Sequence, residues 1–144
     1  MATKIFVNLP VQDLKKSMHF FEKLGYTFNK QFTDEKAACL VISEDIYAML
    51  LRQEFFQTFL RNTTIADAKS TTEALIALSA DSRSQVDELV DKALAAGATK
   101  VREPDDHGFM YARSFHDLDG HIWEIIWMDP STIQPQNGAN ASQS

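Results

Sequence analysis

The amino-acid sequence predicts an α+β fold built from two tandem βαβββ modules. Short β-rich segments alternate with two amphipathic helical segments, and the same order of elements occurs twice along the chain. A glycine follows each helical segment, Gly25 in the first half and Gly97 in the second. We therefore expect a single domain over residues 1–129, with modules at 4–51 and 74–128.

The first module opens with a β-rich segment at residues 4–11, in which Pro10 indicates either the end of the strand or an edge position. Asp13 is a suitable N-cap for a helix over 14–23, because apolar residues then recur at helical spacing. Polar turns separate the three strands that are expected to follow, at 26–32, 37–42 and 46–51.

The second module repeats this order from a strand at 74–80. Either Asp81 or Ser82 can cap the helix that comes next. The step from Asp119 to Gly120 is a strong hairpin signal between the last two strands. The three strands after the helix are expected at 98–102, 110–115 and 121–128.

Two further segments differ in character from the modules. Residues 52–72 are largely polar and are interpreted as a connector. Residues 130–144 are polar and small, so they can bury little surface, and we expect a disordered tail there.

Composition excludes several classes of partner. The chain has 144 residues, and 20 acidic against 14 basic side chains give a formal net charge of −6. No run of Lys or Arg offers the basic surface that nucleic acid or an anionic membrane requires. The single cysteine, Cys39, lies in an apolar run and is interpreted as a buried hydrophobic residue rather than a catalytic thiol. Without a signal peptide or a membrane-spanning run, a cytoplasmic protein is expected.

Two motifs resemble those of the vicinal oxygen chelate superfamily, which contains glyoxalases, bleomycin-resistance proteins and extradiol dioxygenases. Residues 8–26 combine a strand end, an Asp-Leu helix start, an aromatic pair and a Leu-Gly stop, as in the opening of these proteins. Residues 115–125 are similar to their closing hairpin, an Asp-x-Asp-Gly turn that leads into a strand with a glutamate. The resemblance covers about residues 4–129. It implies a glyoxalase-like fold, a U-shaped mixed-sheet cavity and a homodimer.

The resemblance also implies where a divalent metal would bind, and the residues there argue against it. The corresponding positions are Phe6, Leu50, Leu75 and Glu124, of which only Glu124 has a side chain that can coordinate an ion. A shift of one residue along any of the strands brings in only poor ligands, and Asn8 is a weak oxygen donor. We therefore expect a superfamily member that lacks most metal-ligand positions and has no metal or other cofactor.

Glu124 then needs an explanation of its own. Strand alternation places this carboxylate on an apolar face with Ile122 and Ile126, which is costly unless it is paired. One interpretation is a general base or ligand anchor in a dry cavity. The other is a structural acid that hydrogen-bonds to a nearby polar residue such as Asn8, a tyrosine or an arginine.

A second concentration of polar residues precedes this strand. Tyr111 and Arg113 share one face of the neighbouring strand, where they could bind an anionic ligand if that face lines the cavity. If it is the outer face, they pack or face solvent. His107 stands beside Gly108, either at a pocket mouth or in a surface turn.

The favoured function is a small-molecule pocket protein that binds or acts on an organic ligand without a complete metal site. Glu124 is its candidate catalytic residue, and the expected ligand-binding residues are Phe6, Asn8, Leu50, Leu75, His107, Tyr111 and Arg113. Two alternatives remain open. One is a metal-dependent lyase or dioxygenase, similar to lactoylglutathione lyase, and the other is a noncatalytic interaction domain with a filled core.

Overall fold

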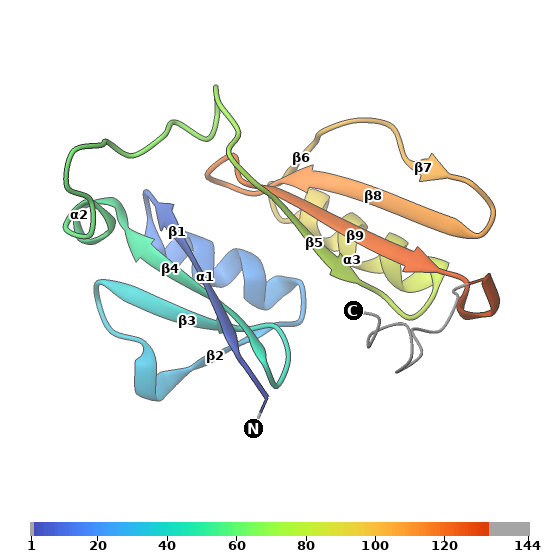
Figure 1. Cartoon of the computed structure of the whole chain (residues 1–144), viewed down its shortest axis with the longest axis horizontal. Coiled ribbons are helices and arrows are strands. Elements are labelled where there is room, and N and C mark those ends of the chain that lie inside the picture. Colours follow the sequence, from blue (N-terminus) through green and yellow to red (C-terminus); the bar gives the residue numbers. More distant parts are fainter. Residues whose placement is uncertain (1, 133–144) are drawn as a thin grey trace, which may run out of the picture.

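A computed structural model describes residues 2–132 and shows two β-sheets side by side with two long helices on one face (Figure 1). The predicted α+β fold with two βαβββ modules is confirmed. The first half contains β1 (Ile5–Val11), α1 (Leu14–Lys23), β2 (Thr27–Asn29), η1 (Lys30–Phe32), β3 (Ala37–Val41), β4 (Ile46–Arg52) and α2 (Gln53–Gln57). The second contains β5 (Leu75–Ser79), α3 (Arg83–Ala95), β6 (Thr99–Lys100), β7 (Asp105–Asp106), β8 (Met110–His116), β9 (Ile122–Met128) and η2 (Pro130–Thr132).

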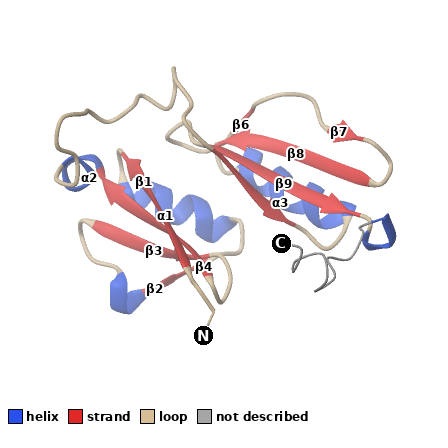
Figure 2. Cartoon of the chain, in the orientation of Figure 1, coloured by secondary structure: helices blue, strands red, loops and turns tan. Residues whose placement is uncertain are grey.

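The two sheets have the same topology. Strands run in the order β1-β4-β3-β2 in one sheet and β5-β9-β8-β6 in the other, with β7 also paired to β8 (Figure 2). In each sheet the first strand pairs in parallel with the last strand of its module, and the other pairs are antiparallel. The strands β1 and β5 are therefore sheet edges. Pro10 fits this edge position because it has no N–H to donate to a further strand.

Two predicted strands are shorter than expected. The segment 26–32 forms only the three residues of β2, because the Asn29 side chain accepts a hydrogen bond from the Gln31 N–H at 2.9 Å and caps a 3-10 turn. The segment 98–102 forms only β6, and the chain then leaves the sheet before β7. Pro104 lies in this excursion and lacks a donor for strand pairing.

Both helices begin as the sequence predicts. Asp13 accepts a hydrogen bond from the Lys16 N–H at 3.1 Å, and Ser82, rather than Asp81, accepts one from the Gln85 N–H at 3.0 Å. Gly25 follows the first helix with φ 104°, in the left-handed region that favours glycine.

One hydrophobic core joins the modules, between the helices and the sheets. Phe21 of α1 packs edge-on against Trp123 of β9 at a ring-centroid distance of 5.2 Å, and Phe20 contacts Phe115 at 6.1 Å. Leu50, Ala38, Val86 and other apolar residues of both modules belong to the same buried cluster. Packing of α1 against the second sheet therefore fixes the two modules relative to each other.

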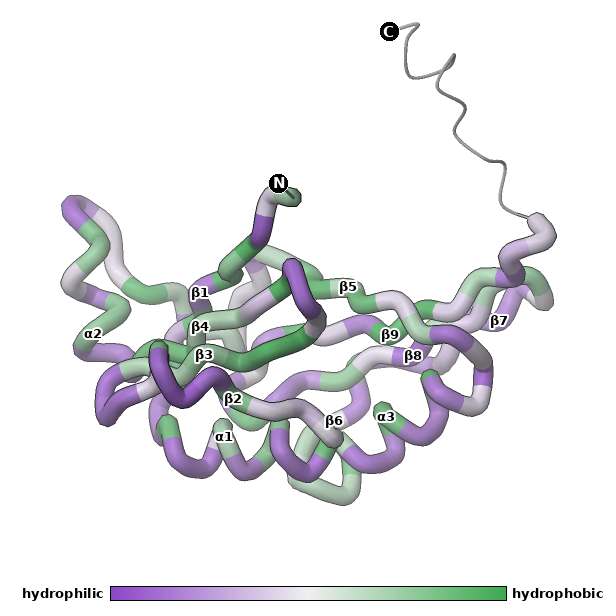
Figure 3. The backbone as a smooth tube through the Cα atoms, turned by 90° about the horizontal axis from the view of Figure 1, so that it is seen from below, coloured by the Kyte–Doolittle hydropathy of each residue, from purple (hydrophilic) through white to green (hydrophobic). Residues whose placement is uncertain are grey.

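Within residues 2–132, the opposite face of the sheets has no helix layer of comparable extent. Figure 3 shows α1 and α3 together on one side, with both sheets above them. The short α2 contacts β1 and β4, and η1 contacts β3. We call the strand surface that points away from α1 and α3 the open face.

Among the described residues, no helix is both long and apolar enough to cross a membrane. The tail expected at 130–144 starts with the 3-10 turn η2, and its residues from 133 onward lie outside the described part of the chain.

Candidate functional site

Strand register assigns each predicted site residue to a face. Phe6 pairs with Tyr47, Leu75 with Ile122 and Ser114 with Glu124, and their side chains belong to the open face. The open-face residues of the paired central strands are Phe6, Asn8, Pro10, Tyr47, Met49, Leu51, Ala37, Cys39, Val41, Leu75, Ala77, Ser79, Met110, Ala112, Ser114, His116, Ile122, Glu124, Ile126 and Met128. Glu124 is the single Asp, Glu, Lys or Arg in this set, so the central strands contribute almost no charge to the open face although the chain carries −6.

Leu50 does not line the open face, and its prediction as a ligand-binding residue is wrong. Its side chain is fully buried in the core with Ala48 and Leu40. Phe6 and Leu50 therefore lie on opposite faces of the same sheet. The open-face residues on either side of it along β4 are Met49 and Leu51, and neither of these is a ligand for a hard metal ion.

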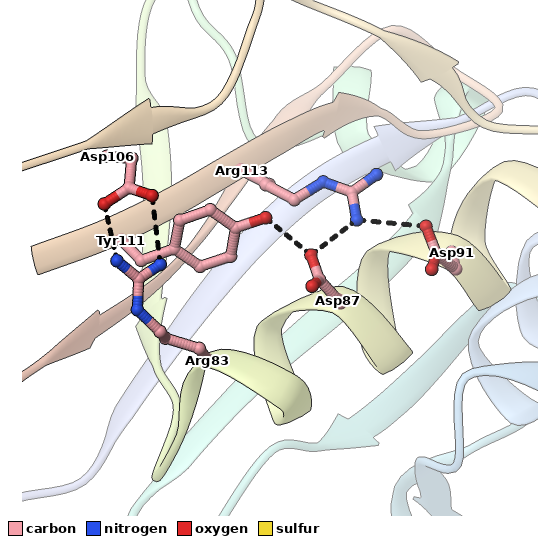
Figure 4. A network of polar contacts seen from close by, with 6 residues as sticks. All are labelled: Arg83, Asp87, Asp91, Asp106, Tyr111 and Arg113. Carbon is pink, nitrogen blue, oxygen red and sulfur yellow. Dashed lines mark hydrogen bonds and ion pairs between the residues drawn. The ribbon is translucent and has the colours of Figure 1, made fainter. Parts of the chain in front are cut away.

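Tyr111 and Arg113 also lie away from the open face, which corrects their assignment to the ligand cavity. Both side chains reach α3 (Figure 4). The Tyr111 hydroxyl donates to Asp87 at 2.6 Å, and Arg113 donates to Asp87 at 2.8 Å and to Asp91 at 3.0 Å. The Arg83 guanidinium stacks over the Tyr111 ring at 4.7 Å. These contacts attach α3 to β8 and are structural.

The network of Figure 4 predicts a pH-dependent contribution to stability. The Tyr111 hydrogen bond, with Arg113, holds the pKa of Asp87 below its ordinary value of 3.8. The ionised carboxylate therefore stabilises the fold above that pH, and the contribution disappears as the pH falls through the folded-state pKa. Asp87→Asn should lower the free energy of unfolding by about 1 kcal/mol at neutral pH.

Urea unfolding of Asp87→Asn and of the unmodified protein should show this difference near pH 7 and lose most of it below the ordinary carboxyl pKa. Asp91→Asn is the matched control, because Asp91 is more exposed and contacts only Arg113. An equal loss in both variants, or a loss independent of pH, would contradict the assignment.

His107 occupies the turn between β7 and β8. Its side chain is exposed, and its backbone N–H donates to the Met110 carbonyl at 2.9 Å. Of the two interpretations that the sequence left open, the structure therefore favours the surface turn over the pocket mouth.

Glu124 lies on the open face as strand alternation predicts, and it is paired. Its carboxylate oxygen is 2.9 Å from a guanidinium nitrogen of Arg102, while only 14% of the Glu124 side chain is exposed. Arg102 also donates to Asp105 at 3.0 Å and to the Ser114 hydroxyl at 3.3 Å. These hydrogen bonds, Asp105 first and then Glu124, raise the pKa of Arg102 and keep it charged.

Arg102 belongs to the excursion between β6 and β7, where no strand or helix pattern indicates its direction. A buried carboxylate requires a cation, and this requirement was the only signal in the sequence for such a partner. With its charge compensated, Glu124 fits the structural interpretation better than that of a free general base.

Removal of Arg102 should therefore destabilise the fold through Glu124. Arg102→Ala is expected to lower the free energy of unfolding by about 1–2 kcal/mol, because it leaves a largely buried carboxylate without its partner. Adding Glu124→Gln should restore most of the loss, since a neutral amide is less costly to bury. Denaturant unfolding of the single and double variants measures this coupling. Additive losses would show that the pair does not interact.

The residues on the open face do not fit a metal ion. Phe6 and Leu75 have no donor atom, and the one carboxylate, Glu124, is held by Arg102. Within residues 2–132, no group of three or more His, Cys, Asp or Glu side chains is placed to hold a metal. A step that needs a bound metal therefore finds no ligand set here.

A pocket lies where the two modules meet, and we call it the seam pocket. Its volume is about 290 Å³. β1, the beginning of β5 and β9, α2 and the connector all contribute to its walls, which are mostly apolar. The lining residues are Val7, Asn8, Leu9, Pro10, Phe56, Ala66, Ala68, Thr71, Thr72, Glu73, Ala74, Ile76, Gly120, His121 and Ile122. Of the residues predicted from the sequence, Asn8 alone lines it.

His121 is the functional candidate that sequence reasoning missed. It lines the seam pocket, and its Nε2 is 2.8 Å from the Pro10 carbonyl oxygen of the other module. The sequence places this residue only beside the last turn. A contact across 111 positions leaves no local pattern by which it could be found.

A buried carboxylate shapes the turn that carries His121. Asp117 accepts hydrogen bonds from the Trp123 indole N–H at 2.9 Å and from the backbone N–H groups of Asp119 and His121 at 2.9 and 3.0 Å. Burial raises the pKa of the Asp117 carboxyl, against the opposing effect of His121 and these donors. Gly120, with φ 92°, passes so close to Ala68 that a Cβ would lie 2.9 Å from its backbone carbonyl.

Comparison with known proteins supports the family assignment. Residues 3–43 match the family described as bleomycin resistance protein-like N-terminal. A solved structure of hypothetical protein SA1046 from S. aureus is 30% identical, with a TM-score of 0.73, and the match covers 88% of this chain and 94% of that one. No curated protein matches the sequence.

More distant structures share the fold. A glyoxalase/bleomycin resistance protein/dioxygenase family enzyme from Burkholderia phytofirmans is 19% identical, with a TM-score of 0.71 over 88% of this chain and 99% of that one. The fosfomycin resistance protein FosX from Mesorhizobium loti is 15% identical, with a TM-score of 0.63 over 88% and 92%. These matches show a glyoxalase-like fold, and together with the motifs and the family match over residues 3–43 they support the resemblance to the vicinal oxygen chelate superfamily.

Proposed function

We propose that the chain is a small-molecule binding protein whose organic ligand occupies the seam pocket without a metal ion. The observation that carries this proposal is the pocket itself, a hollow of about 290 Å³ with mainly apolar walls from both modules. An apolar cavity of about 150 Å³ is sufficient for benzene in another protein. A single ring or a short branched chain is therefore the appropriate ligand size.

The names of similar proteins agree with a small organic ligand. The matching family is described by resistance to bleomycin, and two of the similar structures are fosfomycin resistance proteins. We also propose a cytoplasmic location, which is supported by the single cysteine, buried and free in the structure.

We further propose that the protein is a homodimer that pairs through the open face. Phe6 and Leu75 are 49% and 59% exposed there, and Met128 is 44% exposed. Such an apolar surface without a covering layer is typical of an interface. Two like copies can approach through this face because its central strands contribute almost no charge.

A metal-dependent lyase or dioxygenase is the alternative activity, and metal analysis distinguishes it. If the proposal holds, protein purified without chelators should contain far less than one divalent ion per chain. Near-stoichiometric, tightly bound metal would contradict it.

The direct test is a thermal unfolding screen against single-ring and short-chain compounds. Compounds that bind the folded protein raise the melting temperature in a concentration-dependent way. Ala74→Phe should abolish these shifts, because Ala74 lines the pocket and a phenyl group would fill it. Ala95→Phe is the matched control, since Ala95 is exposed on α3 on the opposite side of the sheets. Shifts that persist in Ala74→Phe, or no shift with any compound, would favour an interaction domain instead.

A further inference from the structure

We propose that the seam pocket selects ligands that carry a hydrogen-bond donor, and that His121 and Asn8 accept those bonds, one from each module. This inference rests on the proposed function. It assigns a ligand class, neutral or cationic molecules with a hydroxyl or N–H group on a small apolar body.

The His121 contact fixes which ring nitrogen carries the proton. A carbonyl oxygen can only accept, so the 2.8 Å contact with the Pro10 carbonyl requires a hydrogen on Nε2. The proposal concerns the neutral form of the ring, in which the imidazole has one N–H and Nδ1 is an acceptor. Among the described residues, none donates a hydrogen bond to Nδ1. His121, which lines the pocket, therefore has an acceptor that a ligand can use.

Asn8 follows the same logic from the other module. Its amide nitrogen donates to the Phe6 carbonyl at 3.1 Å, and this contact orients the amide because that oxygen can only accept. The side-chain carbonyl of Asn8 remains as an acceptor. In the described part of the chain it too receives no hydrogen bond.

The other polar groups of the pocket favour the same ligand class. The Thr71 hydroxyl donates to the Asp67 carbonyl at 3.0 Å, which leaves its oxygen to accept. Glu73 adds a carboxylate, and the lining includes no lysine or arginine. Among the described lining side chains, a carboxylate or phosphate ligand would find only the Thr72 hydroxyl and the second Asn8 N–H as donors, and no compensating cation. A hydroxyl or N–H group would meet partners.

Three probes of similar size test the inference, namely phenol, anisole and benzoate. Phenol has a donor, anisole replaces that hydrogen with a methyl group, and benzoate is an anion. Measured by titration calorimetry or NMR, phenol should bind about tenfold more tightly than anisole, the factor that corresponds to one net hydrogen bond. Benzoate should bind more weakly than either.

The outcomes separate the two proposals. If anisole and phenol bind equally in the pocket, the pocket function stands and the donor selection is wrong. If none of the probes binds, the proposed function fails, and this inference fails with it. Tighter binding of benzoate than of phenol would overturn the assigned ligand class.

His121→Phe identifies the residue that is responsible. The variant keeps a ring of similar size without the acceptor, so the preference for phenol over anisole should fall several-fold while anisole binding persists. His19→Phe is the control, because His19 is exposed on α1 away from the pocket. If His121→Phe does not fold, nitrogen-15 NMR of the unmodified protein gives the same answer. The Nδ1 resonance of His121 should move with phenol and not with anisole, and an unchanged resonance would contradict the role of His121.

Discussion

Replacing Asp117 by alanine is expected to lower the free energy of unfolding by about 3 kcal/mol, the largest loss of stability anticipated for a single polar residue here. The substitution leaves three N–H groups without an acceptor, one of them the Trp123 indole in the core. Each unsatisfied buried donor costs about 1–3 kcal/mol. The total stays below the sum for three donors, because the cost of burying the carboxylate is removed as well.

Denaturant unfolding measures this loss, and two controls show its origin. Asp119→Ala removes the neighbouring carboxylate, which accepts from the exposed Gln12 N–H and from the Ser17 hydroxyl, and should cost less because it leaves no indole donor unpaired in the core. Trp123→Phe removes the indole donor, so Asp117→Ala should cost less in that background. An equal cost of Asp117→Ala in both backgrounds would show that the indole contact contributes nothing.

This loss should also reach the ligand site. The backbone N–H of His121 is one of the three donors to Asp117, and both His121 and Ile122 line the seam pocket. At a temperature where Asp117→Ala is still folded, weaker binding of pocket ligands is therefore expected than in Asp119→Ala.

The sequence was sufficient for the fold because the information is local. Helical spacing, the caps at Asp13 and Ser82, and the glycines after each helix indicate elements whose order alone defines the module. The strand predicted at 98–102 was too long, because the chain leaves the sheet after Lys100 and Arg102 then pairs with Glu124. That contact joins residues from separate parts of the module, so no local periodicity in the sequence predicts it.

The site was less predictable, for a reason that differs between residues. The alternation of side chains along a strand placed Glu124 correctly on one face with Ile122 and Ile126, because this prediction needs only the order of residues within β9. Leu50 was misplaced because a shift of one residue exchanges the two faces of a strand. Tyr111 and Arg113 share a face of β8, as predicted, but the alternation of side chains along one strand does not show which of its two faces packs against α3. His121 was missed because its partner lies at the far end of the chain.

A carboxylate on the open face should abolish the proposed homodimer. Leu75→Glu places an acid among exposed apolar residues, and a two-fold axis puts the substitution into the interface twice. Burial of two unpaired carboxylates costs several kcal/mol, so the dissociation constant should rise at least about 100-fold. Phe6→Glu should act in the same way from the other sheet. Sedimentation equilibrium over a range of protein concentrations measures the effect.

Ala95→Glu adds the same charge on α3, which lies on the opposite side of the sheets, and should leave the dimer unchanged. Melting temperatures of the three variants establish that each chain is still folded. A folded Leu75→Glu chain that remains dimeric would place the interface elsewhere, and dissociation by Ala95→Glu alone would place it on the helices. Phe6 and Leu75 lie outside both the core and the lining of the seam pocket. A monomeric variant that still binds pocket ligands would therefore show that the pocket is formed by one chain.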